Sequence, residues 1–369
     1  MRNTLICTVG TSLVGNLSRS EGDLQTAFSQ QNWQQVARLL NQLENTDRAC
    51  GAEINSISRI CEKNLLDQPL RLIFLVSETE AGKATGQLLK QYYQTVKNPI
   101  QFETVEVRIL KGLRDDDVKA FRQEGLKNLV REISTEVQKF SSEAIAINAT
   151  GGYKAQISFA GMIGQALEIP VYYLFERFSE VIELPPQPIA LDLGFWINNY
   201  LAFEQLEAEE TLRKSELLQE FDTRYFSTLL DEEIIENTSV VSLSATGMLF
   251  HQRSRLQFQK QQTTLLSLVP KTDISPDEKA IHLREDHGKD ILLKFAKKLI
   301  QSPYVTKIIN SLPFNPYQNH PLRASKENGI IELVLTETDQ GLGLCVQTTG
   351  RNSKETSAIA IHLVDQFFN

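Results

Sequence analysis

The chain has 369 residues, of which 41% are hydrophobic and 23% charged, and its formal net charge is −8. This length predicts two or three domains, and the composition is typical of a folded globular protein rather than a disordered, collagen-like or disulfide-scaffold chain. The longest apolar runs are far shorter than the roughly 20 residues of a membrane span, and the N-terminal residues lack the apolar stretch of a signal peptide. We therefore expect a cytoplasmic protein without a membrane-spanning segment.

The net negative charge and the spacing of the cysteines exclude further kinds of binding site. A net negative charge disfavours a surface covered with phosphate-binding cations, so a nucleic-acid partner must be bound at a local basic site. The four cysteines show no C-x-x-C spacing, and we expect buried free thiols without a disulfide or a metal site. These residues are Cys7, Cys50, Cys61 and Cys345.

The first 190 residues alternate between short β-branched runs and helical patterns. The predicted strands are residues 5–9, 70–76, 105–110, 144–147 and 170–174. The predicted helices between them include residues 81–93, 117–140 and 155–167. This alternation predicts an α/β domain with a parallel sheet covered on both faces, in which ligands bind beyond the carboxyl ends of the strands.

Two of these strand ends carry side chains and glycines that suit a phosphate. The first strand leads into Thr-Val-Gly-Thr-Ser at residues 8–12, where Gly10, Thr11 and Ser12 offer a tight turn, backbone N–H groups and hydroxyls. The fourth strand leads into residues 148–154, in which paired glycines allow close backbone approach and a lysine adds a point charge. The residues that we expect to contact a ligand in this second loop are Asn148, Thr150, Gly151, Gly152, Tyr153 and Lys154.

The pair of motifs at residues 8–12 and 148–154 resembles the ligand motifs of CARF domains, the Rossmann-like CRISPR-associated sensors of type III systems. The resemblance implies a sensor domain over residues 1–188 and a cyclic oligoadenylate ligand held by two copies of the domain, and therefore a homodimer. A cyclic tetra-adenylate is the preferred ring. No cofactor is implied.

Some sensors of this family degrade their own ligand, and Ser12 and Lys154 match positions associated with that activity. A hydroxyl and a cation beside a clamped phosphodiester would stabilise the charge of a pentacoordinate phosphorus. The same two groups suit binding without cleavage equally well. Both interpretations stay open at this point.

Residues 189–265 form the expected middle segment. Between residues 204 and 236 there are eleven acidic residues against three basic ones, on a helical pattern of leucines and phenylalanines. The segment is predicted to be a helical or winged-helix-like linker, and residues 257–264 a loose polar connector. Its acidic helices would repel a DNA duplex, which favours a role in spacing and dimer contact over transcriptional regulation.

Residues 266–369 are predicted to be an α+β domain. The expected order is a strand at 279–284, helices at 290–301 and 305–312, strands at 329–335 and 341–348, and a closing helix at 354–368. Residues 322–326 are a candidate extra strand. No Arg and His have the spacing of HEPN ribonucleases, and no Glu-x-Lys triplet suits a restriction-type nuclease, so a metal-independent chemistry is expected.

The element order of this domain, with Phe295-Ala-Lys-Lys-Leu and Thr349-Gly-Arg-Asn-Ser-Lys-Glu before the last helix, resembles RelE-type messenger RNA interferases. The resemblance implies cations that stabilise a scissile phosphate while a 2′-OH attacks, and it extends to cleavage of messenger RNA on the ribosome. The matching cations are Arg323, Lys326, Arg351 and Lys354. The tyrosine that the family often carries in its last helix is missing, and His320 or His282 is the expected substitute as acid or base.

The sequence therefore predicts a cyclic oligoadenylate-activated, metal-independent endoribonuclease of type III CRISPR antiviral defence. Two alternatives remain. One is a ring nuclease whose only chemistry is ligand degradation, and the other is a ligand-responsive transcription regulator.

Overall fold

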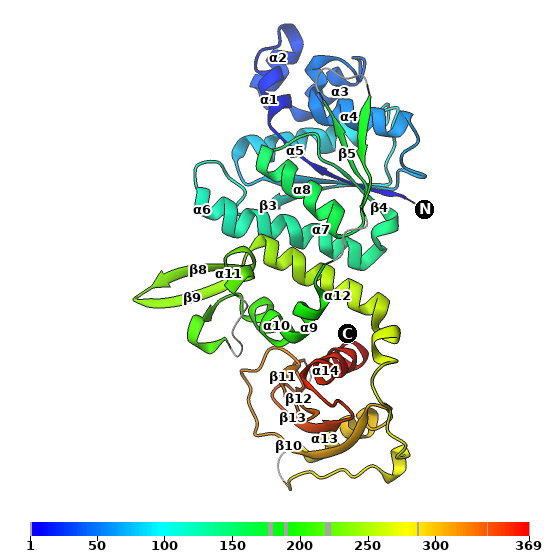
Figure 1. The fold of residues 1–369 in the computed structure, drawn as a ribbon. Coiled ribbons are helices and arrows are strands. Elements are labelled where there is room, and N and C mark those ends of the chain that lie inside the picture. The colour runs from blue at the N-terminus through cyan, green and yellow to red at the C-terminus, as the bar shows by residue number, and fades with distance from the viewer. Residues whose placement is uncertain are drawn as a thin grey trace. The chain divides into compact units, whose positions relative to one another are not determined.

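The computed structural model describes residues 2–175, 180–187, 191–217, 223–285, 288–337 and 339–368. The chain folds into two compact units, Met1–Ala190 and Leu191–Asn369 (Figure 1). Each unit has a hydrophobic core of its own. The expected boundary at residue 188 and part of the expected helical pattern, residues 218–222, lie outside the described residues. Within the described residues, every helix is too short or too polar to span a membrane.

A six-stranded sheet forms the centre of the first unit. Its strands are β1 (Thr4–Thr8), β2 (Arg71–Ser77), β3 (Thr104–Leu110), β4 (Ile145–Asn148), β5 (Val171–Leu174) and β6 (Val181–Leu184). They lie in the order β3-β2-β1-β4-β5-β6, and all neighbours are parallel except β5 and β6. The α/β fold with parallel strands is thus confirmed. The antiparallel strand β6 was not predicted, because its mostly exposed side chains carry no core signal.

Helices cover both faces of this sheet (Figure 1). One face bears α1 (Ser12–Leu17), α2 (Gly22–Ser29), α3 (Trp33–Leu40), α4 (Gly51–Glu62) and α5 (Glu80–Tyr93). The other bears α6 (Val118–Ala120), a π-helical turn at Phe121–Gly125, α7 (Leu126–Phe140) and α8 (Lys154–Ala166). Strand β1 is buried along its whole length, since Leu5 and Cys7 join the core under α1 to α5 while Ile6 points to the opposite layer. Burial on both faces explains its continuous apolar sequence.

The second unit begins with helices and a small antiparallel sheet. The helices are α9 (Leu193–Asn198), α10 (Tyr200–Glu209), α11 (Thr223–Leu229) and α12 (Ala245–Leu266), and the strands are β7 (Leu212–Arg213), β8 (Leu230–Ile235) and β9 (Thr238–Leu243). The predicted helical pattern is wrong at 230–235, which pair with β9 as a projecting hairpin. The predicted loose connector at 257–264 is wrong as well, because it continues α12, where Phe258 is fully buried.

The rest of the second unit is a four-stranded antiparallel sheet with two helices. Its elements are α13 (Lys289–Leu299), β10 (Val305–Ser311), β11 (Leu322–Ser325), β12 (Ile330–Val334), β13 (Gly343–Thr348) and α14 (Ser353–Phe367), with strand order β10-β13-β12-β11. The predicted helix at 305–312 is the strand β10, because its β-branched side chains pair with β13. The predicted strand at 279–284 is reduced to one bridge between Ile281 and Ile308.

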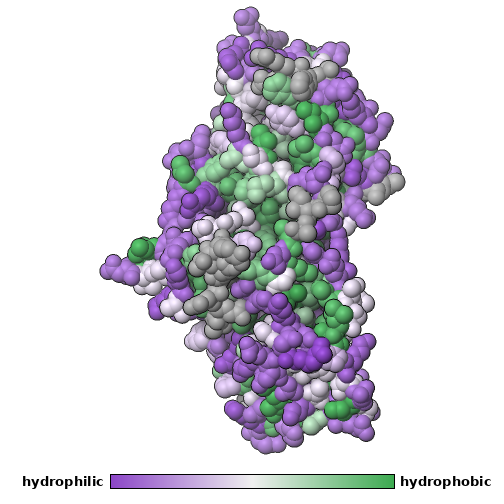
Figure 2. Space-filling model, viewed as in Figure 1, coloured by the Kyte–Doolittle hydropathy of each residue, from purple (hydrophilic) through white to green (hydrophobic). Residues whose placement is uncertain are grey.

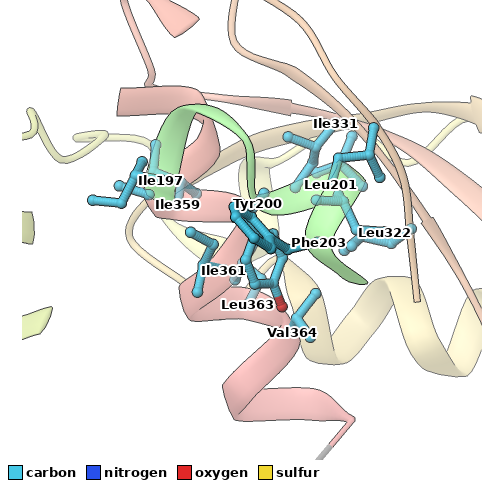
Figure 3. Close-up of a cluster of buried hydrophobic side chains, with 14 of the residues drawn as sticks. Ile197, Tyr200, Leu201, Phe203, Leu322, Ile331, Ile359, Ile361, Leu363 and Val364 are labelled. Carbon is cyan, nitrogen blue, oxygen red and sulfur yellow. The ribbon is translucent and has the colours of Figure 1, made fainter. Parts of the chain in front are cut away.

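One core joins these two parts of the second unit. Figure 3 shows Ile197, Tyr200 and Phe203 of α9 and α10 beside aliphatic side chains of α14. Leu322 and Ile331 of the four-stranded sheet belong to the same cluster. Residues 191–369 therefore form one compact unit, in which the helical segment buries its apolar face against the α+β segment.

Figure 2 shows a mostly hydrophilic surface, with apolar side chains on the projecting β8–β9 hairpin. Ile234 and Ile235 of that hairpin are 78% and 52% exposed.

A partly buried ion-pair network ties α10 to α12. Arg255 Nη2 lies 2.5 Å from Glu204 and 2.7 Å from Glu207, and His251 completes the group. Burial alone would raise the pKa of Glu204, but Arg255 and His251 lower it to about 2. The two carboxylates are therefore ionised and depend on the guanidinium.

We predict that Arg255→Met lowers the free energy of unfolding by about 3 kcal/mol, because it leaves the partly buried carboxylates of Glu204 and Glu207 without their cation. Urea denaturation followed by circular dichroism measures this change. Arg213→Met is the control, since Arg213 lies in an exposed pair with Glu216, and it should shift stability by about 1 kcal/mol at most. Equal effects of the two variants would contradict the assignment.

Candidate functional site

The loops that follow β1 and β4 lie side by side. The two strands are parallel neighbours with Cys7 opposite Asn148, so their carboxyl ends meet at one edge of the sheet. The hydroxyl of Thr8 donates a hydrogen bond to the carbonyl of Gly151. A Cβ on Gly10 would lie 2.9 Å from the backbone nitrogen of Gly152. The two predicted ligand motifs are thus in direct contact.

Three of the predicted ligand residues present free polar groups at this edge. Thr11, Ser12 and Lys154 are exposed, and in the described part of the chain none of their side chains has a hydrogen bond or an ion pair. Ser12 is the first residue of α1 and Lys154 the first of α8. The arrangement offers two hydroxyls and one ammonium group to an anion.

Asn148 and Thr150 have a different place from the one expected. Asn148 is buried, its Nδ2 donates to Ser56 Oγ at 2.8 Å, and its Oδ1 accepts from the hydroxyl of Thr150 at 2.7 Å. The Thr150 oxygen also accepts from the backbone N–H of Leu174 at 3.0 Å. Both side chains stabilise the loop through hydrogen bonds within the protein, instead of facing a ligand.

The glycines of the second loop are required by side chains beneath them. A Cβ on Gly151 would overlap Oε1 of Glu53, and a Cβ on Gly152 would overlap Oε1 of Gln156. Gly152 also has a positive φ of 116°, which L-residues rarely adopt. The sequence suggested that the paired glycines allow a phosphate to approach the backbone closely. In the structure, the groups that approach these glycines are the buried side chains of Glu53 and Gln156.

Glu53 of α4 is part of this site and was missed by sequence reasoning. It is fully buried, and its Oε1 accepts the backbone N–H of Gly10 at 2.7 Å. The N–H expected to face a phosphate is therefore occupied from inside. Burial raises the pKa of the Glu53 carboxyl above its ordinary range. The available signal was an acidic residue among the apolar positions of 53–60, but 43 residues separate it from Gly10.

Tyr153 lies at the border of the second loop. Its ring packs edge-on against Phe121 with centroids 5.5 Å apart. Partial burial raises the pKa of its hydroxyl, and hydrogen bonds to Ser77 and Thr79 oppose this. The ring therefore joins the ends of β2 and β4 at the same edge of the sheet.

The predicted cations of the second unit lie on two adjacent loops. Arg323 and Lys326, on β11 and just after it, approach Glu332 at 3.6 and 3.1 Å. The turn after β11 reaches the loop after β13, because Thr348 N–H donates to the carbonyl of Gly329 at 2.7 Å. A cavity of about 660 Å³ opens here, lined by Glu327, Asn328, Arg351, Asn352, Ser353 and Lys354.

Acidic neighbours hold these cations. Arg351 is exposed and pairs with Glu355 at 2.7 Å, as Arg323 and Lys326 pair with Glu332. Glu332 and Glu355 would have to release these cations before the cations could contact a bound phosphate. The site is therefore weakly cationic in the free protein.

His320 is separated from these cations. Its imidazole is buried, Nδ1 lies 2.8 Å from the carbonyl of Leu322, and burial lowers its pKa. His320 precedes β11 and Lys326 follows it. The four residues of this strand separate its two ends by about 13 Å. The structure does not bring His320 to the cavity. His282 is exposed beside β10.

Glu204, Glu207 and His251 form the described group whose chemistry could suit a metal, with ligand atoms within 4.8 Å of one another. Trp196 Nε1 donates to His251 Nδ1 at 2.8 Å, so this nitrogen has no lone pair free for a metal, and Nε2 faces the two carboxylates and Arg255. Arg255 fills the space between the acids. These N–H donors do not fit a cation.

Part of the first unit matches a known protein family. Residues 48–187 match the model of a family described as CRISPR-associated protein (Cas_APE2256). The match includes Glu53 and the loop 148–154 but not residues 8–12, and it spans less than half of the chain. The solved structure of Can2 from Sulfobacillus thermosulfidooxidans in complex with cyclic tetra-adenylate (cA4) is similar at 12% identity, over 74% of this chain and 69% of that chain, with a TM-score of 0.24. A likeness of that degree carries no conclusion about this chain.

We predict that Gly151→Ala destabilises the first unit by about 1 to 3 kcal/mol, since the added methyl group would overlap Glu53. Gly161→Ala is the matched control within α8, because its Cβ would meet no atom within 4 Å, and it should stabilise the protein by about 0.5 to 1 kcal/mol. Thermal unfolding of the two variants provides the measurement. A melting temperature of Gly151→Ala equal to that of the wild type would contradict this prediction, because it would show that the loop accommodates a methyl group.

Proposed function

We propose that the first unit is a sensor that binds a cyclic oligoadenylate, preferably a ring of four adenylates, as part of type III CRISPR antiviral defence. The observation that carries the proposal is the meeting of Thr11, Ser12 and Lys154 at the carboxyl edge of a parallel sheet. The resemblance of the two loops to CARF motifs and the family match over residues 48–187 support it.

The chemistry of the edge suits a phosphodiester. Lys154 brings a point charge, and Thr11 and Ser12 bring hydroxyl donors. One unit offers a single Lys154, whereas a cyclic oligoadenylate has several phosphates related by symmetry. A homodimer with two such edges across a two-fold axis would contact the ring symmetrically.

Ring cleavage is a second candidate activity of the same site. In that reaction a ribose 2′-oxygen attacks the adjacent phosphorus, the 5′-oxygen leaves with a proton, and a 2′,3′-cyclic phosphate remains. The free Ser12 hydroxyl and the Lys154 ammonium favour it, since both are able to orient or stabilise the phosphate. Ser12 is then the residue that separates cleavage from binding.

For the second unit we propose a metal-independent endoribonuclease of RelE type, which acts on messenger RNA at the ribosome when the sensor is occupied. Support comes from the cavity where Arg351 and Lys354 meet the turn that carries Lys326. Arg351 would bind the scissile phosphate in a bidentate manner once Glu355 releases it. A site so closely balanced by carboxylates holds free RNA poorly, which fits dependence on the ribosome.

The regulator alternative receives no comparable support. The β8–β9 hairpin, which would be the wing, carries Asp231, Glu232 and Glu233. Like charge would keep a hairpin of this kind away from a DNA backbone.

We predict that Lys154→Ala weakens binding of cyclic tetra-adenylate by about 10- to 100-fold, because a charge-assisted contact of about 1.5 to 3 kcal/mol is lost. Isothermal titration calorimetry provides the affinity. Lys97→Ala is the control, since this exposed lysine follows α5 at the opposite edge of the sheet. An unchanged affinity for Lys154→Ala would remove the phosphate assignment.

Arg351→Ala should lower RNA cleavage by roughly 10²- to 10³-fold, the scale of one preorganised electrostatic contact, while ligand affinity stays unchanged. The assay contains translating ribosomes and cyclic tetra-adenylate, and a chelator should leave the wild-type rate unaffected. Arg213→Ala, an exposed arginine on β7, is the control. Full cleavage by Arg351→Ala, or loss of wild-type cleavage with chelator, would require another active site.

A further inference from the structure

The carboxyl group of Glu53 lies directly beneath the candidate phosphate site. Its side chain is 0% exposed, its Oε1 accepts from Gly10 N–H, and Gly151 lacks the side chain that would displace it. The backbone of Gly10 and Gly151 therefore lies directly against this carboxyl group. A charge here acts on the bound anion through little intervening solvent.

The second oxygen of this carboxyl group has no partner. Oε2 is buried, and among the described residues no hydrogen bond reaches it and no lysine, arginine or histidine forms an ion pair with Glu53. An isolated buried carboxylate is strongly disfavoured, and protonation removes that charge at the smaller cost of one unpartnered O–H group. The geometry thus favours a neutral side chain in the folded protein.

We infer that Glu53 is a positioning residue that sets ligand affinity by its charge: the neutral form supports the Gly10 and Gly151 loops, and the ionised form repels an anionic ligand. This rests on the proposed binding of a cyclic oligoadenylate at these loops. The ring would be bound more tightly while Glu53 keeps its proton and more weakly once Glu53 loses it.

Few other ionisable groups surround Glu53. Strand β1 contributes Cys7, whose thiol pKa is raised by burial, so that it stays neutral. The loop before α8 contributes Lys154, three residues beyond Gly151 and exposed. Helix α4 itself contributes Glu62, nine residues and about 13 Å further along the helix. Burial is the main reason that the pKa of Glu53 is raised, and the Gly10 N–H opposes it.

Glu53→Gln tests the inference, because it keeps the shape and the acceptor while removing the charge. Calorimetric titration with cyclic tetra-adenylate between pH 5 and pH 9 should give equal affinities for both proteins at the acidic end. As the pH rises through the pKa of Glu53, the wild-type affinity should fall by roughly tenfold while that of Glu53→Gln stays level. Glu62→Gln, an exposed and ion-paired acid of the same helix, should follow the wild type.

Unfolding of the ligand-free proteins provides an independent readout. A folded-state pKa above the unfolded value gives stability that is present at low pH and lost as the pH rises, so Glu53→Gln should gain in melting temperature over the wild type with increasing pH. Coincident binding curves for the two proteins, or weaker binding by Glu53→Gln at every pH, would overturn the inference. If no protein binds the ring although the melting temperatures diverge, the proposed ligand is wrong, and the role of Glu53 in affinity is overturned with it.

Discussion

The parallel pairing of β1 with β4 is the constraint on which the candidate site depends. It places the loops at residues 8–12 and 148–154 on one edge, although some 140 residues separate them along the chain. Every free polar group that we assign to the ligand belongs to one of these loops. A change of strand order would leave each loop as an ordinary connection between a strand and a helix.

Beneath these loops lies a layer of buried polar side chains that sets their shape. Glu53 holds Gly10, Asn148 links α4 to the second loop, and Gln156 accepts the N–H of Tyr153. Except for Oε2 of Glu53, which has no partner among the described residues, their polar atoms bond to backbone groups and to neighbouring side chains. Ser12 and Lys154 remain exposed. This difference follows from burial, because buried polar groups need partners within the protein and only exposed groups can exchange water for a ligand.

In the second unit the shared core decides where the cations lie. Apolar side chains from α9 and α10 close the core under the four-stranded sheet, and α14 runs through both parts. The loop before α14 is thereby anchored beside the turn after β11, so that Arg351 and Lys354 line one cavity with Glu327 and Asn328 of that turn. Removing the helical segment would expose this core, and the cation site is a property of the whole unit.

Local sequence indicated the five parallel strands of the first unit and its helices α5, α7 and α8, because β-branched runs and turn residues agree there with the final fold. It did not indicate β6 or the helices between β1 and β2. It also singled out the two loops, whose glycines and lysine have few other uses. Tertiary structure alone decided the rest: residues 305–312 form a strand because β13 offers a partner, and residues 257–264 remain helical because Phe258 is buried. The role of Glu53 was decided in the same way, since only the folded chain brings it from a distant helix to Gly10. Periodicity reports which face of an element is apolar, but not which partner covers that face or which buried charge it encloses.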